Sequence, residues 1–272
     1  MLDRITSPQN ARVKKTIKLR YRKYRKELGL VRIEGLREIS RAFEAGLVFE
    51  EVFVCPEIII KEVRTGSFDP RLFYKNWEQN HVTIWETTRS VFSKMAFGDR
   101  HEGMIALCQY PELFLKDLPR PKNPFYVVVE NVEKPGNLGA ILRTCDGVGV
   151  DGVIVTDMQT DIFNLNVIRS SLGTVFSVPI VQTSNEDARK IFIEQNIHTV
   201  AALPQAKKLY THAKYNSPLA IIVGNEQEGL RSYWKTHSDM SIRIPMRGKA
   251  DSLNVSTAIA VLLYEVLRQR EG

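Results

Sequence analysis

The most constraining feature of the sequence lies near its end, in residues 242–265, which read IRIPMRGKADSLNVSTAIAVLLYE. The alternating isoleucines at its start predict a short buried strand, which Pro245 ends because proline lacks the backbone donor that a central strand needs. A small polar loop follows, and Ser252 or Asn254 is expected to cap an almost unbroken apolar helix over residues 255–267. A loop held between a buried strand and a buried helix presents its amides and carbonyls at fixed positions. This arrangement suits a small polar ligand, although an ordinary βα connection would have the same pattern.

Upstream of this stretch the pattern alternates between strands and helices. Residues 125–130 (FYVVVE) form a continuous apolar run, which is typical of a parallel strand buried on both faces. Repeated alternation of β and α predicts a parallel α/β sheet. Further strands are expected at 153–156, within 174–181, at 199–203 and at 219–223, and helices at 138–145, 164–172 and 186–195.

A proline-rich polar stretch divides the chain of 272 residues into two parts of ordinary domain size. We therefore predict an N-terminal domain over residues 1–108, a linker over 109–124 and a second domain over 125–272. Lys and Arg outnumber Asp and Glu by 23 to 16 in residues 1–122, whereas each group numbers 15 in the remainder. The whole net charge of +7 thus lies in the first part, which indicates a polyanion-binding part and a neutral part.

The basic residues concentrate in residues 7–28, where Pro8 suggests the start of a helix of about four turns. Like charges crowd this segment with almost no acid between them, which costs self-repulsion unless a polyanion is nearby. A solvated surface helix is the plainer alternative. The candidate RNA-binding residues here are Lys14, Lys15, Lys18, Arg22 and Lys23.

Several classes of protein are disfavoured. No apolar run approaches about 20 residues, so no membrane span is expected, and the N-terminus lacks an apolar signal core. Three cysteines without metal-like spacing and five dispersed histidines predict neither a disulfide framework nor a metal site. A reducing cytoplasm fits this composition.

Residues 147–152 spell GxGxxG, the fingerprint of dinucleotide-binding folds. That fingerprint requires its glycines after a strand and at the start of a helix. Here they follow a predicted helix and precede a predicted strand. Gly147 and Gly149 are therefore interpreted as helix-stop and turn glycines.

Three motifs, in one order, resemble those of the SpoU (TrmH-like) branch of the SPOUT RNA methyltransferases. They are NVEKPGNLGAILRTC at 131–145, IVGNEQEGL at 222–230 and IPMRGKADSLNVSTA at 244–258. The resemblance covers roughly residues 125–269 and implies a catalytic domain with a mostly parallel sheet and a deep trefoil knot, which no composition argument predicts. The run EGLREISRAFEAG at 34–46 is similar to the smaller N-terminal α/β domain, ribosomal L30e-like, that precedes many such catalytic domains.

The resemblance also implies site residues. Arg143 matches the arginine beside the 2′-hydroxyl, and since a free guanidinium is a poor base, we expect it to stabilise the alkoxide. Whether Arg143 or the substrate phosphate takes the proton is left open. The other catalytic candidates are Asn137, Glu226, Asn254 and Ser256; the cofactor candidates are Ala202, Gly224, Ile244, Met246 and Leu253; and Arg169 is an RNA-binding candidate. Cys145, where the family carries a small residue, suggests either a nucleophile or a packed thiol, and packing is favoured.

These features together predict an S-adenosylmethionine-dependent 2′-O-ribose methyltransferase that acts on ribosomal RNA. The alternatives are a tRNA 2′-O-methyltransferase and a catalytically silent RNA-binding or ribosome-assembly protein. The resemblance implies a homodimer, and the helix at 255–267, apolar on many faces, agrees with this.

Overall fold

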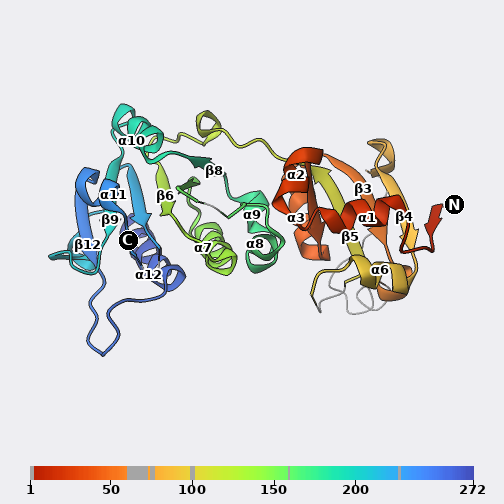
Figure 1. Cartoon of the computed structure of the whole chain (residues 1–272). Coiled ribbons are helices and arrows are strands. Elements are labelled where there is room, and N and C mark those ends of the chain that lie inside the picture. Colours follow the sequence, from red (N-terminus) through yellow and green to blue (C-terminus); the bar gives the residue numbers. More distant parts are fainter. Residues whose placement is uncertain (1–2, 60–72, 74–76, 99–101, 159, 226–227) are drawn as a thin grey trace. The chain divides into compact units, whose positions relative to one another are not determined.

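The computed structural model describes residues 3–59, 73, 77–98, 102–158, 160–225 and 228–272. The chain forms two compact units, coloured along the sequence in Figure 1. The first unit comprises Met1–Glu112 and Phe163–Ser177, and the second comprises Leu113–Ile162 and Val178–Gly272. The chain therefore passes between the units three times, rather than once through the proline-rich linker.

The first unit contains a mixed five-stranded sheet in the order β1-β4-β3-β5-β2. The first three strands of this order run parallel, and β5 is antiparallel to both β3 and β2. Its elements are β1 (Asp3–Ile5), α1 (Ala11–Lys18), α2 (Arg22–Leu28), β2 (Leu30–Glu34), α3 (Leu36–Glu44), β3 (Phe49–Val54), β4 (Thr83–Thr87), α6 (Arg89–Met95), β5 (Met104–Gln109), α8 (Leu165–Ser170) and α9 (Thr174–Ser177).

The basic segment forms two short helices, so the prediction of one helix starting near Pro8 is wrong. The first helix, α1, starts after Asn10, whose side chain accepts a hydrogen bond from the amide of Arg12. The break before α2 is fixed by Arg25, which is buried and donates to the carbonyls of Leu19 and Arg20 at 2.8 Å each. These carbonyls lie beyond the end of α1 and would otherwise lack a partner.

The segment Phe163–Ser177 groups with the first unit, although the sequence pattern placed it in the second domain. Its helices contact β2 and α3, the Arg41 guanidinium donates to the carbonyl of Leu172 at 2.8 Å, and Phe163 packs edge-on against Tyr110. Residues 174–177 form the helix α9 rather than part of a strand. These contacts join residues more than 50 positions apart, so local periodicity cannot reveal them.

The second unit is built on a seven-stranded sheet in the order β10-β12-β9-β11-β6-β7-β8, in which all neighbouring strands are parallel. This confirms the predicted α/β class. Its elements are β6 (Phe125–Glu130), α7 (Pro135–Val148), β7 (Gly152–Thr156), β8 (Ile180–Thr183), α10 (Asn185–Glu194), β9 (His198–Ala202), β10 (Lys208–Leu209), β11 (Leu219–Val223), α11 (Ser232–His237), β12 (Met240–Arg243) and α12 (Val255–Glu271).

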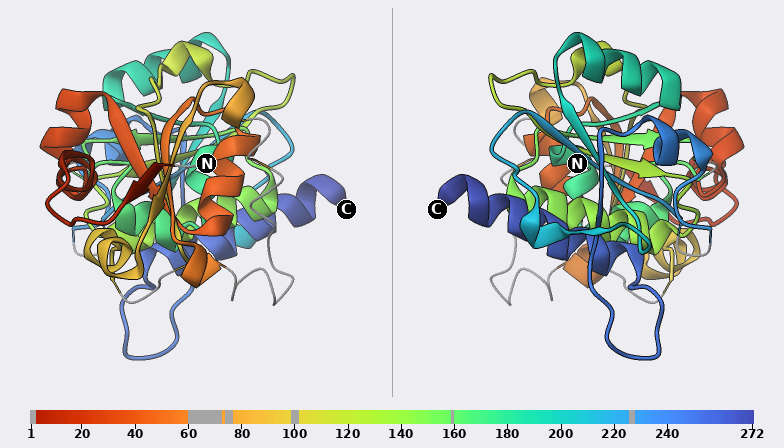
Figure 2. Two further views of the ribbon diagram at one scale, coloured as in Figure 1. Left: turned by 90° about the vertical axis from the view of Figure 1, so that its right-hand side faces the viewer. Right: turned by 90° about the vertical axis from the view of Figure 1, so that its left-hand side faces the viewer.

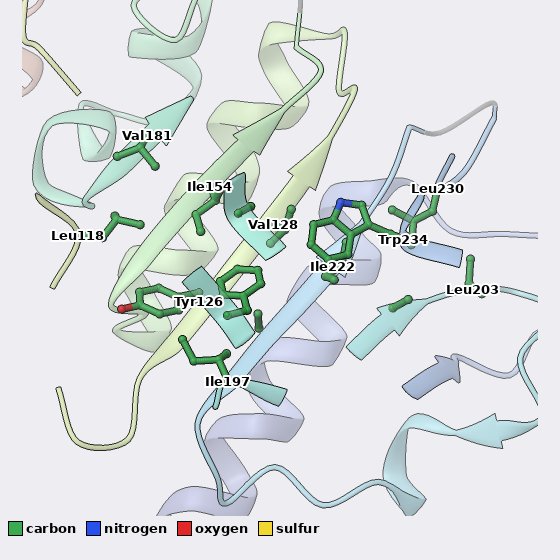
Figure 3. Packing of buried hydrophobic residues seen from close by; sticks show 14 of the residues in the cluster. Leu118, Tyr126, Val128, Ile154, Val181, Ile197, Leu203, Ile222, Leu230 and Trp234 are labelled. Atoms are coloured by element: carbon green, nitrogen blue, oxygen red, sulfur yellow. The ribbon is translucent and has the colours of Figure 1, made fainter. Parts of the chain in front are cut away.

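Helices cover both faces of this sheet. Figure 2 shows α12 running beside α7 on one face and α10 on the other. Alternate strand residues such as Tyr126, Val128 and Ile222 pack with Phe192 and Trp234 on the α10 face, and Figure 3 shows most of this cluster. Because both faces are covered, the strand FYVVVE is buried along its whole length.

Of the glycines in the GxGxxG sequence, Gly149 ends a helix, whereas the interpretation of Gly147 as a helix-stop glycine is wrong. The helix α7 closes at Gly149, which has the left-handed φ of 72°, while Gly147 lies inside the helix. Among the residues that the structure describes, no helix has the length and apolar character needed to cross a lipid bilayer.

Candidate active site

A cavity of about 290 Å³ opens at the carboxyl ends of three neighbouring strands of the second unit. The strand ends of β9, β11 and β12 form its floor, and the first turns of α12 form one wall. All five residues predicted to bind the cofactor line it: Ala202, Gly224, Ile244, Met246 and Leu253. The carboxyl edge of a parallel sheet is where α/β folds bind their ligands.

Gly224 lines this cavity and also has a structural role. A Cβ atom at this position would lie 2.4 Å from the backbone of Gly229 and Leu230. Because glycine has no side chain, the backbone of Gly229 and Leu230 can lie close to the end of β11. The backbone amide of Gly229 donates to the carbonyl of Asn225 there at 2.9 Å. Gly224 shapes the cavity by permitting this close approach.

Two hydrogen bonds fix the loop that follows β11 to the end of β6. The side-chain amide of Asn225 donates to the carbonyl of Asn131 at 3.0 Å, and the backbone amide of Arg231 donates to the buried carboxylate of Glu130 at 2.7 Å. Burial raises the pKa of Glu130, while the hydrogen bonds from the Arg231 amide and the side chain of Asn185 partly oppose that effect. Asn225 lines the cavity, and its place directly after Gly224 in the second motif is the signal that sequence reasoning overlooked.

Three of the predicted catalytic residues meet beside the cavity. The side-chain amide of Asn254 donates to Oδ1 of Asn137 at 3.3 Å, and its own Oδ1 accepts from the backbone and hydroxyl of Ser256 at 2.9 and 2.6 Å. Asn254 is thus the N-cap of α12, while Asn137 lies in the first turn of α7. Nδ2 of Asn137 is buried and has no hydrogen-bond partner in the described part of the chain. A buried donor without a partner is costly, so this atom is available to a ligand acceptor.

Arg143 lies six residues beyond Asn137 on α7, about 9 Å further along the helix. Its side chain is exposed, and it forms neither a hydrogen bond nor an ion pair with any residue that the structure describes. An arginine that supports only the fold would be expected to have a carboxylate or carbonyl partner. Its charge is therefore free to act on a bound anion.

The remaining predicted residues lie elsewhere. Glu226 falls outside the described residues. Arg169 belongs to the first unit, where it donates to the carbonyl of Phe97 and lies 5.8 Å from the ring of that residue. Lys15 pairs with Glu51, whereas Lys14, Lys18, Arg22 and Lys23 are exposed.

The thiol of Cys145 is fully buried in α7 among core residues. Burial raises the pKa of this thiol far above its ordinary value. A nucleophilic cysteine must be accessible and readily ionised. The structure therefore favours the packed thiol over the nucleophile.

The cavity has the chemistry that S-adenosylmethionine requires. Apolar side chains, among them Leu203, Ile244 and Leu253, can enclose an adenine ring. Carboxylates of Glu228 and Asp251 suit hydroxyl and ammonium groups. The cationic side chains Lys235 and Arg243, which also line the cavity, suit a carboxylate.

The fold and cavity define an α/β enzyme with a small-molecule site at the carboxyl edge of its parallel sheet. Residues 124–264 match the SpoU rRNA Methylase family, and residues 10–106 match the MRM3-like substrate binding domain. The chain belongs to the SpoU rRNA methylase family, which confirms the resemblance of its three motifs.

Curated and solved relatives agree with this assignment. The chain is 33% identical to the 23S rRNA (guanosine-2′-O-)-methyltransferase RlmB of Escherichia coli K12, over 88% of this chain and 98% of that protein. A crystal structure of an RNA 2′-O ribose methyltransferase superposes with a TM-score of 0.81 at 38% identity, covering 98% of this chain and 99% of the other. An AdoMet-bound rRNA methyltransferase from Sinorhizobium meliloti has a TM-score of 0.83 at 27% identity, with 98% of each chain covered.

Proposed function

We propose that this protein transfers a methyl group from S-adenosylmethionine to the 2′-hydroxyl of a guanosine ribose in 23S ribosomal RNA. Two findings support methylation of ribosomal RNA by an S-adenosylmethionine-dependent enzyme. The chain belongs to the SpoU family, and it matches rRNA methyltransferases over nearly their whole length. The guanosine and the large-subunit RNA are taken from the curated relatives. One structural observation carries the proposal: five residues from three distant segments line one cavity, directly beside the Asn137–Asn254 pair.

The catalytic roles are assigned from this geometry. S-adenosylmethionine, bound in the cavity, supplies an electrophilic methyl group. Asn254, which lies between the lining residues Leu253 and Val255, and its partner Asn137 orient the ribose, with Nδ2 of Asn137 donating to a substrate oxygen. Arg143 stabilises the developing alkoxide by its charge, since a guanidinium stays protonated and cannot act as the base, and the proton of the 2′-hydroxyl passes to an oxygen of the substrate phosphate. Ser256 holds the side chain of Asn254 in place.

RNA recognition is divided between the units in this proposal. The exposed cations Lys14, Lys18, Arg22 and Lys23 contact phosphates, and the match of residues 10–106 to a substrate-binding domain supports this role. Arg169, which the sequence suggested for RNA contact, is bonded within the first unit and positions α8 there.

Assembly and location form part of the same proposal. The protein is a homodimer in which α7 and α12 lie at the interface. The 54% exposure of Tyr264 on α12 supports an apolar contact there. A cytoplasmic location follows from the ribosomal substrate.

Two rival functions are distinguished by one experiment. Purified protein, S-adenosylmethionine and either ribosomal RNA or tRNA are incubated, and 2′-O-methylated nucleotides are mapped by mass spectrometry of nuclease fragments. Methylation of a single guanosine in 23S RNA is expected. Methylated tRNA alone would support the tRNA enzyme. Absence of methylation of either RNA, together with no S-adenosylmethionine binding in calorimetry, would support the silent RNA-binding protein.

A further inference from the structure

The loop that follows β12 projects from the second unit, as the blue segment between β12 and α12 in Figures 1 and 2 shows. From Met246 to Ser252 no residue forms a hydrogen bond or an ion pair with any other described part of the chain. Backbone amides and carbonyls are strong hydrogen-bonding groups, and those without a partner in the chain bond to water or to a ligand. This loop therefore offers its polar groups to partners outside the chain.

The ends of the loop and its middle have different surroundings. Met246 and Asp251 line the cavity, so the base of the loop belongs to the cofactor pocket. Between them, Arg247 and Lys249 are exposed and do not line the cavity. The two cations are two residues apart, so their Cα atoms lie within about 7 Å of each other.

The charge at this tip is local. The chain from residue 123 onward carries equal numbers of acidic and basic residues, so the two cations at the tip do not reflect a net basic charge of that part of the chain. Asp251 is the one carboxylate in the loop, and it forms no ion pair with either cation. Two unpaired cations directly beside a reaction site fit a polyanion that passes that site.

We propose that Arg247 and Lys249 form a phosphate clamp, which binds the backbone of the RNA strand that presents the target ribose. This inference rests on the proposed function, because it assigns the substrate contact of the same site. Guanidinium binds phosphate through two parallel hydrogen bonds, and ammonium binds as a compact charge. The catalytic unit thereby holds the substrate itself, in addition to the basic surface of the first unit. Phosphate contacts hold a strand without reading its bases, so the clamp adds affinity for RNA rather than selecting the nucleotide.

The test uses the full-length protein with the double substitution Arg247→Gln and Lys249→Gln. Binding to a ribosomal RNA fragment that contains the target is measured from 50 to 300 mM salt. The log–log salt slope is expected to become shallower by up to about 0.9 per lost contact, and affinity at low salt to fall about tenfold. KM for RNA should rise, kcat at saturating RNA should hold, and cofactor affinity measured by calorimetry should not change.

Matched variants separate the clamp from general charge. Lys190→Gln with Lys207→Gln removes two exposed cations from the same unit and should leave the salt slope unchanged. Arg247→Lys keeps the charge and should retain most of the slope. If the loop variant has the same salt slope and the same affinity for RNA as the Lys190 and Lys207 control variant, the clamp is overturned.

Two other outcomes also decide the matter. Dissociation of a dimer in the loop variant, seen by sedimentation, would assign the two cations to a protein contact and overturn the clamp. Failure of the unmodified protein to methylate ribosomal RNA would instead overturn the proposed function. In that case the salt slopes of binding still support or overturn the clamp, because they do not depend on turnover.

Discussion

Asn254 and Asn137 lie 117 positions apart in the sequence, yet the side-chain amide of one donates to the side-chain oxygen of the other at 3.3 Å. This bond joins the first turn of α7 to the N-cap of α12, so the first and third motifs meet at one point. The cavity residues Leu253 and Val255 flank Asn254 directly. The pair therefore connects the cavity with the helix that carries Arg143.

Asn254 uses its side-chain oxygen to cap α12 and its side-chain amide to contact Asn137, so we expect that a substitution can affect catalysis without affecting the cap. Asn254→Asp keeps an oxygen that accepts from Ser256, so α12 should stay capped and the Tm nearly unchanged. It replaces the donor to Asn137 with a second acceptor, so single-turnover methylation should fall by at least about tenfold. Asn254→Ala should lower both activity and stability, the latter by about 1 kcal/mol. Equal rates for Asn254→Asp and the unmodified enzyme would contradict the role assigned to the pair.

Arg143→Ala should reduce the single-turnover rate by about 10² or more, the usual effect of losing a group that stabilises charge in the transition state. Cofactor affinity should stay near normal, because Arg143 does not line the cavity. Arg143→Lys should restore the rate only in part, since an ammonium lacks the planar two-point contact. Cys145→Ala is the control and should keep most activity. A near-normal rate for Arg143→Ala in rapid-quench experiments would refute the mechanism.

Gly224→Ala should weaken cofactor binding, because the new side chain would displace backbone that lines the cavity. The new Cβ would meet the backbone of Gly229 and Leu230 at 2.4 Å, so the loop after β11 must move. Overpacking of this kind costs about 1–3 kcal/mol, and S-adenosylmethionine affinity should fall by about tenfold or more in calorimetry. Gly248→Ala is a matched control, because nothing lies within 4 Å of its added carbon. Normal cofactor binding by Gly224→Ala would show that the turn tolerates the shift.

The basic surface of the first unit should act through phosphate contacts. Changing Lys14, Lys18, Arg22 and Lys23 to Gln should weaken RNA binding and reduce the log–log salt slope by about 0.7–0.9 per lost contact. Cofactor affinity should not change. Lys15→Gln should instead affect the stability of the first unit, because Lys15 pairs with Glu51. An unchanged slope in the fourfold variant would mean that α1 and α2 do not face RNA.

Asp239 should contribute stability that depends on pH. Partial burial opposes its ionisation, but hydrogen bonds from the amide and hydroxyl of Thr199, at 2.8 and 2.7 Å, outweigh burial and hold the pKa of Asp239 below its ordinary value. A lowered folded-state pKa gives stability that is present above the unfolded value, about 3.9, and is lost as the pH falls through the folded one. Asp239→Asn should therefore lower the Tm at neutral pH. The difference from the unmodified protein should vanish in strong acid, and a constant difference from pH 7 to pH 2 would contradict this account.

The sequence by itself determined the class of fold, since burial on both faces makes parallel strands read as continuous apolar runs. The strands at Phe125–Glu130 and Leu219–Val223 have the predicted limits, and α7 and α12 contain the predicted helices. The second and third motifs also indicated Gly224, Ile244, Met246 and Leu253, which line one cavity in the structure. These signals are local, because they depend on periodicity, caps and the residues of single loops.

Only the tertiary structure decided which distant groups meet. It paired Asn137 with Asn254, assigned Phe163–Ser177 to the first unit, and gave Arg25 a buried role in ending α1. It also showed that the backbone of Gly229 and Leu230 leaves no room for a side chain at position 224. The physical reason is that a local pattern records the preferences of neighbouring residues. The contacts of Arg25, Gly224 and Asn254 depend instead on how the helices, strands and loops pack against one another in the folded chain.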